Sequence, residues 1–353
     1  MKPTTLFLAL MLLPLCGVLA QTVASPPATG PAANLFASEA PFSFTLTARM
    51  QAIVGDRTVP RHDSLAIKHA ALLTYPAMAG EHAGQIPLTL VVRGNFRRDA
   101  KHCQFPPLYV DFPKKKVNDT PFAGQNNLKL VTNCQDEAYV VREYLVYKLY
   151  NIITDLSFRT RLARVTYVDS AKTRPTETRW GFLIEDEDDV ARRNALREYK
   201  PEMSSGGADS VSLATMAVFE FMIGNIDWEV SIRHNVRLMT GPGQSLPRVV
   251  PYDFDHAVIV DAPYASRADN TGQRIYRGPI YPGWLMKRIF DQFNVLKPRF
   301  YALYETDNRL QPDYVRQTLT YLDKFYALIN NPKSVKKLFF GGDKKGAMFA
   351  SFN

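Results

Sequence analysis

The spacing of apolar residues changes partway along the chain from the pattern of strands to the pattern of helices. Strand-like segments come first, at 42–54, 70–75, 87–95, 108–112, 127–132 and 162–168. After a further strand at 180–185, helical spacing predominates, at 188–199, 211–223, 284–293, 299–305 and 314–330. We therefore expect an α+β protein with a β-rich N-terminal lobe at 41–185 and a mainly helical C-terminal lobe at 186–353.

One helix interrupts the strand-like half. Within 137–153, Val141, Leu145 and Leu149 recur on one helical face, and Val140 and Tyr144 widen that face. Little of such a helix can be exposed, so we expect it to lie buried against a small antiparallel sheet.

Residues 1–20 have the pattern of a secretory signal peptide, because Lys2 precedes an apolar run at 6–15 and small residues precede Gln21. The run is about half of the roughly 20 residues that a membrane-spanning helix needs. A flexible leader, rich in Pro, Ala, Ser and Thr, follows at 21–40. We expect a secreted or periplasmic protein without a transmembrane segment, and a lipoprotein anchor at Cys16 is the alternative.

Removal of the signal peptide leaves Cys103 and Cys134 as an even pair in an oxidising compartment. The sequence favours a disulfide between them, which would close a loop of about 30 residues and stabilise the fold by about 3 kcal/mol. A zinc site that includes His102 is the alternative, but it has too few ligands.

Composition limits the class of protein. Apolar residues make up 46% of the 353 residues and charged residues 22%, which excludes a disordered chain or a collagen-like fibre. A net charge of +9 admits anionic partners such as nucleotides. The basic runs Lys114-Lys115-Lys116 and Lys336-Lys337 lack interleaved aromatic residues, so we expect solvated turns and no nucleic-acid site. P-loop, zincin and α/β-hydrolase motifs are missing from the sequence.

A loop, a strand, a turn and a second strand carry the residues that indicate chemistry. Asp227 lies in the loop, Asn235 precedes the first strand, and Asp253 and Asp255 follow the second. If the turn is the tip of an antiparallel hairpin, Asn235 lies opposite Asp253. Asp253 and Asp255 would share one face because strand side chains alternate. An amide oxygen and carboxylates are ligands that magnesium prefers.

These residues resemble the catalytic Asp, the metal-binding Asn and the Asp-Phe-Gly metal ligand of the protein-kinase-like fold. More closely, the chain is similar to the CotH kinase family, secreted kinases that include spore-coat members. Scattered motifs between Pro87 and Ala262 carry the similarity: Arg93-Gly94-Asn95, the Leu128-Lys129-Leu130 strand and the helix after it, Gly181-Phe182-Leu183-Ile184-Glu185, and Pro251-Tyr252-Asp253-Phe254-Asp255. The resemblance implies a bilobal protein-kinase-like fold.

The resemblance also implies roles for three residues that would act on ATP and on the acceptor. Asp227 would be the catalytic residue that orients and deprotonates the acceptor hydroxyl. Lys129 would hold the ATP phosphates, with Glu143 as its ion-pair partner. The simpler interpretations are that Asp227 caps a turn, that Lys129 is a solvated strand residue, and that Glu143 faces water beside Arg142.

Asn235 and Asp253 would bind Mg²⁺ or Mn²⁺, and Asp255 stands where a kinase would have Gly. Asp255 is therefore either a second metal ligand or a support for the turn. The simpler interpretations are an ordinary residue at a strand start for Asn235 and a surface carboxylate for Asp253. His234 and His256 flank the site, where we expect hydrogen-bonding spacers.

Five consecutive acidic residues, Glu185 to Asp189, stand at a junction between a strand and a helix. Their negative charge favours the positive end of the helix that begins near Asp188. In the resemblance, this junction is the hinge between the lobes, and its backbone would meet the adenine.

The chain also departs from the kinase pattern. It has no Gly-x-Gly-x-x-Gly, His-Arg-Asp or Ala-Pro-Glu motif, and Asp227 and Asn235 are eight positions apart rather than five. These differences argue against a regulated eukaryotic-type kinase, and the sequence of the acceptor-binding surface does not indicate which acceptor it binds.

Our leading hypothesis is a secreted atypical kinase that uses magnesium to transfer phosphoryl from ATP to a hydroxyl of an exported protein or glycan. ATP is expected to be scarce outside the cytoplasm. The alternatives are therefore a kinase-shaped binding or scaffold protein without turnover, and nucleotidyl transfer on the same fold.

Overall fold

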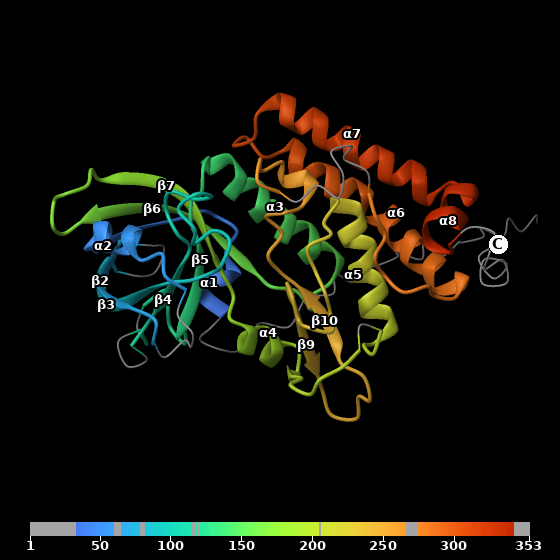
Figure 1. Cartoon of the computed structure of the whole chain (residues 1–353), viewed down its shortest axis with the longest axis horizontal. Coiled ribbons are helices and arrows are strands. Elements are labelled where there is room, and N and C mark those ends of the chain that lie inside the picture. Colours follow the sequence, from blue (N-terminus) through green and yellow to red (C-terminus); the bar gives the residue numbers. More distant parts are fainter. Residues whose placement is uncertain are drawn as a thin grey trace, which may run out of the picture.

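The structure is a computed structural model that describes residues 33–59, 65–77, 82–113, 117–118, 120–204, 206–265 and 274–341. The expected signal peptide at 1–20, most of the leader at 21–40 and the run Lys114-Lys115-Lys116 lie outside the described residues. Most strands lie on one side of the molecule and most helices on the other (Figure 1).

The strands on that side close into a barrel in the order β1-β2-β3-β4-β5-β7-β6. Neighbouring strands are antiparallel except β1 and β6, whose parallel pairing closes the barrel. The barrel strands are β1 (Phe42–Ala48), β2 (Lys68–Tyr75), β3 (Gly84–Val92), β4 (Leu108–Asp111), β5 (Asn127–Val131), β6 (Thr160–Asp169) and β7 (Glu177–Ile184).

This barrel shows that the expected fold class, a bilobal protein-kinase-like α+β fold with a small antiparallel sheet, is wrong. Closure depends on pairing Phe42 with Ala163 and Ala48 with Asp169, which lie far apart in the sequence. Residue alternation predicts where strands run, but it carries no information on which distant strand edges pair. The expected strand at 42–54 also ends early, because Met50–Gly55 form a short helix, α2.

The barrel encloses its own apolar core, to which β5 contributes Leu128 and Leu130. Because strand side chains alternate, Lys129 between them points away from this core. The leader is not wholly without structure, because Ala33–Ala37 form a short helix, α1. Leu35 of α1 is buried in the barrel core, and its carbonyl accepts a hydrogen bond from Arg161.

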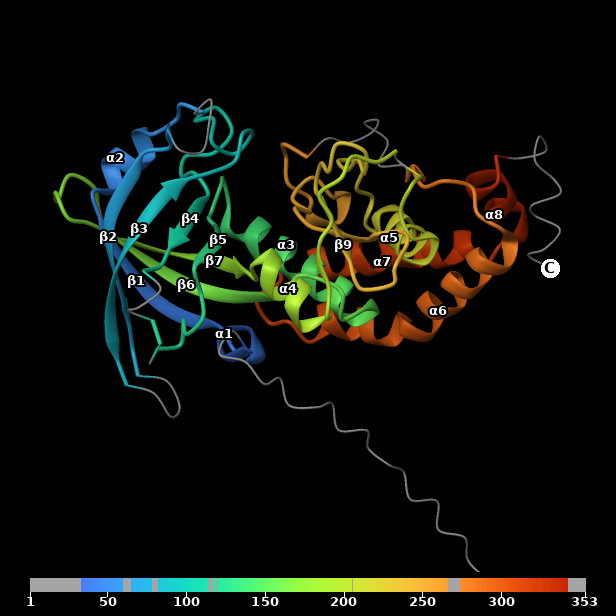
Figure 2. The same ribbon diagram turned by 90° about the horizontal axis from the view of Figure 1, so that it is seen from below.

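The larger helices pack around a second apolar core. They are α3 (Glu137–Ile153), α5 (Ser210–Ile223), α6 (Gly283–Glu305), α7 (Pro312–Ile329) and α8 (Pro332–Phe339). Shorter elements complete this part: α4 (Glu187–Arg193), the 3-10 turn η3 (Val258–Val260) and a sheet in the order β10-β9-β8, made of β10 (Arg248–Pro251), β9 (Val236–Thr240) and β8 (Arg197–Glu198). Figure 2 shows α3 between the barrel and α6.

Helix α3 has the bounds that the sequence predicts, 137–153. The Asp136 carboxylate caps its first turn by accepting the Ala138 N–H at 2.8 Å. Contact with barrel strands on one face and α6 on the other buries the helix, so it can carry Glu143 and Tyr147 into the interior.

Two predictions for helices need correction. The segments expected at 284–293 and 299–305 form one helix, α6, which continues through Pro298. The helix expected at 188–199 ends at Arg193, and β8 follows it. Tertiary packing outweighs local propensity in both segments.

The predicted disulfide between Cys103 and Cys134 is confirmed, with Cα atoms 4.5 Å apart. It joins the loop after β3 to the segment between β5 and α3.

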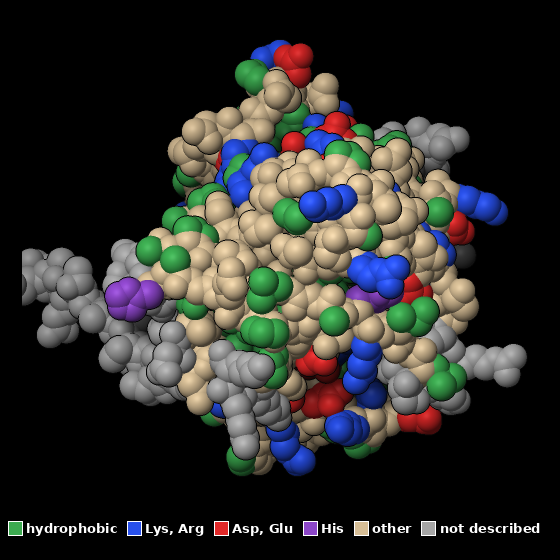
Figure 3. All heavy atoms as spheres, turned by 90° about the vertical axis from the view of Figure 1, so that its left-hand side faces the viewer, with side chains coloured by type: hydrophobic (Ala, Val, Ile, Leu, Met, Phe, Trp, Pro, Cys, Tyr) green, Lys and Arg blue, Asp and Glu red, His purple; other side chains and the backbone are tan. Residues whose placement is uncertain are grey.

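Among the described residues, no helix is long and apolar enough to cross a membrane. On the barrel side of the molecule, basic and acidic side chains are interspersed rather than gathered by sign (Figure 3).

Candidate active site

Two adjoining cavities lie where the barrel meets the helical part. The first, about 620 Å³, is lined by β3, β4 and β5 and by the junction that follows Ile184. The second, about 380 Å³, is lined by the loop after β3 and by the turns that contain Asp227 and Asp253. Arg93, Gly94 and Ile184 line both cavities, so they form one continuous cleft.

Lys129 lines the first cavity without an anionic partner among the described residues. Its Nζ lies over the Tyr252 ring at 4.8 Å, and it forms no ion pair. The Nε of Arg93, at the boundary of the two cavities, is buried and also lacks a partner. Burial and the neighbouring Arg93 and Arg237 lower the pKa of Lys129 to about 8. Lys129 and Arg93 therefore add positive charge to a cavity whose lining also includes Asp111, Asp186 and Glu187, of which Glu187 pairs with Arg237.

The ion pair expected between Lys129 and Glu143 is not formed. Glu143, 1% exposed, instead accepts a hydrogen bond from Arg97 Nη1 at 3.2 Å. Arg97 Nη2 also donates to the Thr132 carbonyl at 2.6 Å. The cation that pairs with Glu143 is therefore an arginine from the loop after β3, and not the lysine that the resemblance implied.

Asp227 lies in a loop whose backbone is fixed by the end of α5 before it and by hydrogen bonds to its own residues. Helix α5 ends at Gly224 with φ +72°, where a Cβ atom would lie only 2.9 Å from the Val258 side chain. The Asp227 N–H then donates to Asn225 Oδ1 at 3.0 Å. Arg277 Nη1 donates to the Trp228 carbonyl at 2.9 Å, so the loop backbone has little freedom.

The Asp227 carboxylate contacts two neighbours. His234 Nε2 lies 2.8 Å from its Oδ1, and Asn235 Nδ2 donates to its Oδ2 at 3.1 Å. The sequence interpretation treated His234 only as a flanking spacer. The longer spacing between Asp227 and Asn235 is taken up by a turn in which the backbones of Glu229 and His234 pair with each other.

The predicted hairpin register is wrong by one residue. Val236 pairs with Pro251, and Tyr252 donates its N–H to the Asn235 carbonyl, so Asn235 lies opposite Tyr252 rather than Asp253. Each residue of the first strand therefore pairs one position earlier on the second strand than predicted.

The shared strand face predicted for Asp253 and Asp255 is also absent, because β10 ends at Pro251 and Asp253 has φ +64°. This turn, rather than strand alternation, directs both aspartates towards the second cavity. The Tyr147 hydroxyl holds it by accepting the Asp253 N–H at 2.8 Å. Phe254 between them is fully buried.

The second cavity brings together carboxylate and amide oxygens, the kind of ligand that hard cations prefer. In the described part of the chain, no hydrogen bond or ion pair engages the Asp253 carboxylate, and Asn235 uses its amide nitrogen on Asp227, leaving Oδ1 free. Burial and Asp253 raise the pKa of Asp255 to about 6. A search of the described residues finds no cluster of three or more His, Cys, Asp or Glu that could hold a metal. The described residues therefore supply few ligands for a metal ion.

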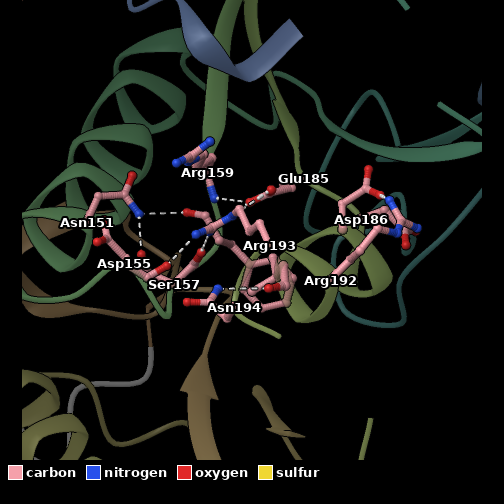
Figure 4. Close-up of polar contacts among 12 residues, drawn as sticks. Asn151, Asp155, Ser157, Arg159, Glu185, Asp186, Arg192, Arg193 and Asn194 are labelled. Carbon is pink, nitrogen blue, oxygen red and sulfur yellow. Dashed lines mark hydrogen bonds and ion pairs between the residues drawn. The ribbon is translucent and has the colours of Figure 1, made fainter. Parts of the chain in front are cut away.

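The junction after β7 is fixed by the network in Figure 4. Arg193 donates to both Glu185 carboxylate oxygens at 2.9 and 3.0 Å and to the Asp155 carbonyl at 2.5 Å. The Glu185 N–H donates to the Arg159 carbonyl at 2.9 Å, so it is not free to meet a base. Asp186 caps α4 by accepting the Asp188 N–H, as helix-end electrostatics predicts.

Comparisons with known proteins add little. No family description matches the chain, and no curated protein matches it. One solved structure it resembles is described as a Helicobacter pylori proinflammatory kinase, CtkA, at 10% identity over 68% of this chain and 90% of that chain. The TM-score is 0.37, and a likeness of that size carries no argument.

Proposed function

We propose that the chain is a metal-dependent kinase that transfers a phosphoryl group from ATP to a hydroxyl. The proposal rests on one observation: in the described part of the chain, unpaired basic groups and free carboxylate and amide oxygens line adjoining parts of the cleft. Among the described residues, Lys129 in the first cavity and Arg93 at the boundary form no ion pair, and Asp253 and Asn235 in the second cavity have free oxygens. A polyphosphate complements the first group and a hard divalent cation the second.

The residues present fit both ligands. Lys129 and Arg93 would hold phosphate oxygens, and Asn235 and Asp253 would hold Mg²⁺ or Mn²⁺. Magnesium keeps several waters and needs one or two carboxylates when phosphates supply its other ligands, so a small protein ligand set suffices. When bound, the metal would neutralise charge on the phosphates.

Asp227 would orient the acceptor hydroxyl and accept its proton as the acceptor oxygen bonds to the γ-phosphorus. The bond from that phosphorus to the β–γ bridging oxygen breaks, and its electron pair leaves with ADP. The contacts from His234 and Asn235 would hold the Asp227 carboxylate in one orientation.

An exported protein or glycan is the acceptor class that we propose. The signal-like sequence at 1–20 supports export, and the Cys103–Cys134 disulfide is typical of oxidising compartments. Asp227 lines the 380 Å³ cavity, where the acceptor hydroxyl would approach it.

Calorimetry with a non-hydrolysable ATP analogue tests the proposal. We expect binding that requires Mg²⁺ and that weakens about 10–100-fold in Asp253→Asn, because a ligand to the cation is lost. Asp291→Asn is the matched control, since Asp291 is an exposed acid on α6 paired with Lys287. Absence of metal-dependent binding would contradict the proposal. Phosphate alone on an acceptor would support phosphoryl transfer, and the whole nucleotide would show nucleotidyl transfer instead.

The pH dependence of nucleotide binding is a separate prediction. The Lys129 pKa of about 8 means that the ammonium is charged at neutral pH and loses its proton as the pH rises through 8. Affinity for the ATP analogue should therefore fall about tenfold between pH 7 and 9. Lys129→Arg keeps its charge throughout and should flatten this dependence in titrations at several pH values. An equally steep fall in the variant would show that another group titrates.

A further inference from the structure

We propose that Arg97 is a positioning residue for the metal-binding turn at 253–256, in place of the lysine expected to pair with Glu143. The inference rests on the proposed function, since its ligand is the cation held at that turn. It assigns a role to a residue that lies outside the motifs of the sequence analysis.

The guanidinium of Arg97 joins three elements of the fold. It binds Glu143 of α3 at 3.2 Å and the Thr132 carbonyl at the end of β5 at 2.6 Å. Its Nη1 also lies 3.9 Å from the Asp255 carboxylate. A planar fork with five N–H donors can serve these acceptors together, which the single ammonium of a lysine cannot.

Asp255 depends on this contact. It is 4% exposed, and the ion pair that it forms within the described residues is the one with Arg97. Asp253 adds negative charge beside it. Without Arg97, two adjacent carboxylates would repel each other in a buried turn, and the turn that presents Asp253 would shift.

A disulfide holds the loop that carries Arg97 close to the carbonyl group that Arg97 binds. The Cys103–Cys134 disulfide ties this loop to the segment just after Thr132, whose carbonyl Arg97 binds. Because Glu143 pairs with Arg97, Lys129 forms no ion pair among the described residues and is available for phosphate. Arg97 would thus both hold the turn that presents Asp253 in the second cavity and leave Lys129 unpaired with Glu143 in the first cavity.

The test is the Mg²⁺ concentration that half-saturates binding of the ATP analogue, measured in full-length wild-type protein and in Arg97→Lys. We expect half-saturation to require about tenfold more Mg²⁺ in the variant, with nucleotide affinity at saturating Mg²⁺ unchanged. The matched control is Arg161→Lys, a buried arginine that binds the Leu35 and Ser38 carbonyls of the barrel side. It should bind Mg²⁺ like the wild type.

Thermal melting separates positioning from a merely structural role. A lower melting temperature with unchanged Mg²⁺ half-saturation would overturn the inference and leave the proposed function standing. A wild-type protein that binds nucleotide without regard to Mg²⁺ would overturn both. If Arg97→Lys does not fold, Arg97→Met combined with Glu143→Met removes both buried charges, and the same tenfold increase is expected.

Discussion

Replacing Asp227 with Asn should lower phosphoryl transfer about 10²–10⁴-fold while leaving affinity for Mg²⁺ and nucleotide nearly unchanged. The amide keeps the size of the side chain but cannot accept the proton of the acceptor hydroxyl. The effect should fall on turnover rather than on binding, because Asp227 lies at the second cavity, away from Lys129.

Turnover can be followed as ADP release with an added acceptor, and nucleotide affinity by calorimetry on the same preparation. Asp323→Asn is the control, because Asp323 is an exposed acid on α7 paired with Lys297. If Asp227→Asn retains wild-type turnover, Asp227 is not the base. If it loses nucleotide binding, its role is to hold the cation.

Replacing Phe254 with Ala should destabilise the protein by about 3–5 kcal/mol. Phe254 is completely buried, and its ring packs against Tyr147 at 4.8 Å and Phe219 at 5.6 Å. Removing it would leave a cavity where α3, α5 and the 253–256 turn meet, so metal-dependent nucleotide binding should weaken as well.

Chemical denaturation measures the free energy of unfolding of this variant. Val295→Ala provides a surface comparison, because Val295 is 77% exposed, and its substitution should change stability by no more than about 0.5 kcal/mol. A loss below about 1 kcal/mol in Phe254→Ala would mean that the turn is not part of the cooperative core.

Features governed by local physics were predictable from the sequence. The helix at 137–153 needs only a continuous run of apolar positions and a capping aspartate, and its bounds match the prediction. The pairing of Cys103 with Cys134 followed from counting cysteines. Asp227, Asn235 and Asp253 could be chosen as candidates because each residue type and its spacing indicate chemistry, and the structure lines one cavity with all three.

Features that depend on distant parts of the chain were not predictable. The closing pair of β1 with β6 and the pairing of Glu143 with Arg97 are contacts between distant segments. The register that sets Asn235 opposite Tyr252 depends instead on the geometry of the hairpin turn. The sequence by itself determined the approximate positions of most strands and helices and identified Asp227, Asn235 and Asp253 as candidate functional residues. Only the tertiary structure decided which of them meet, because the pairing of strand edges and the satisfaction of buried charges depend on the whole packed chain.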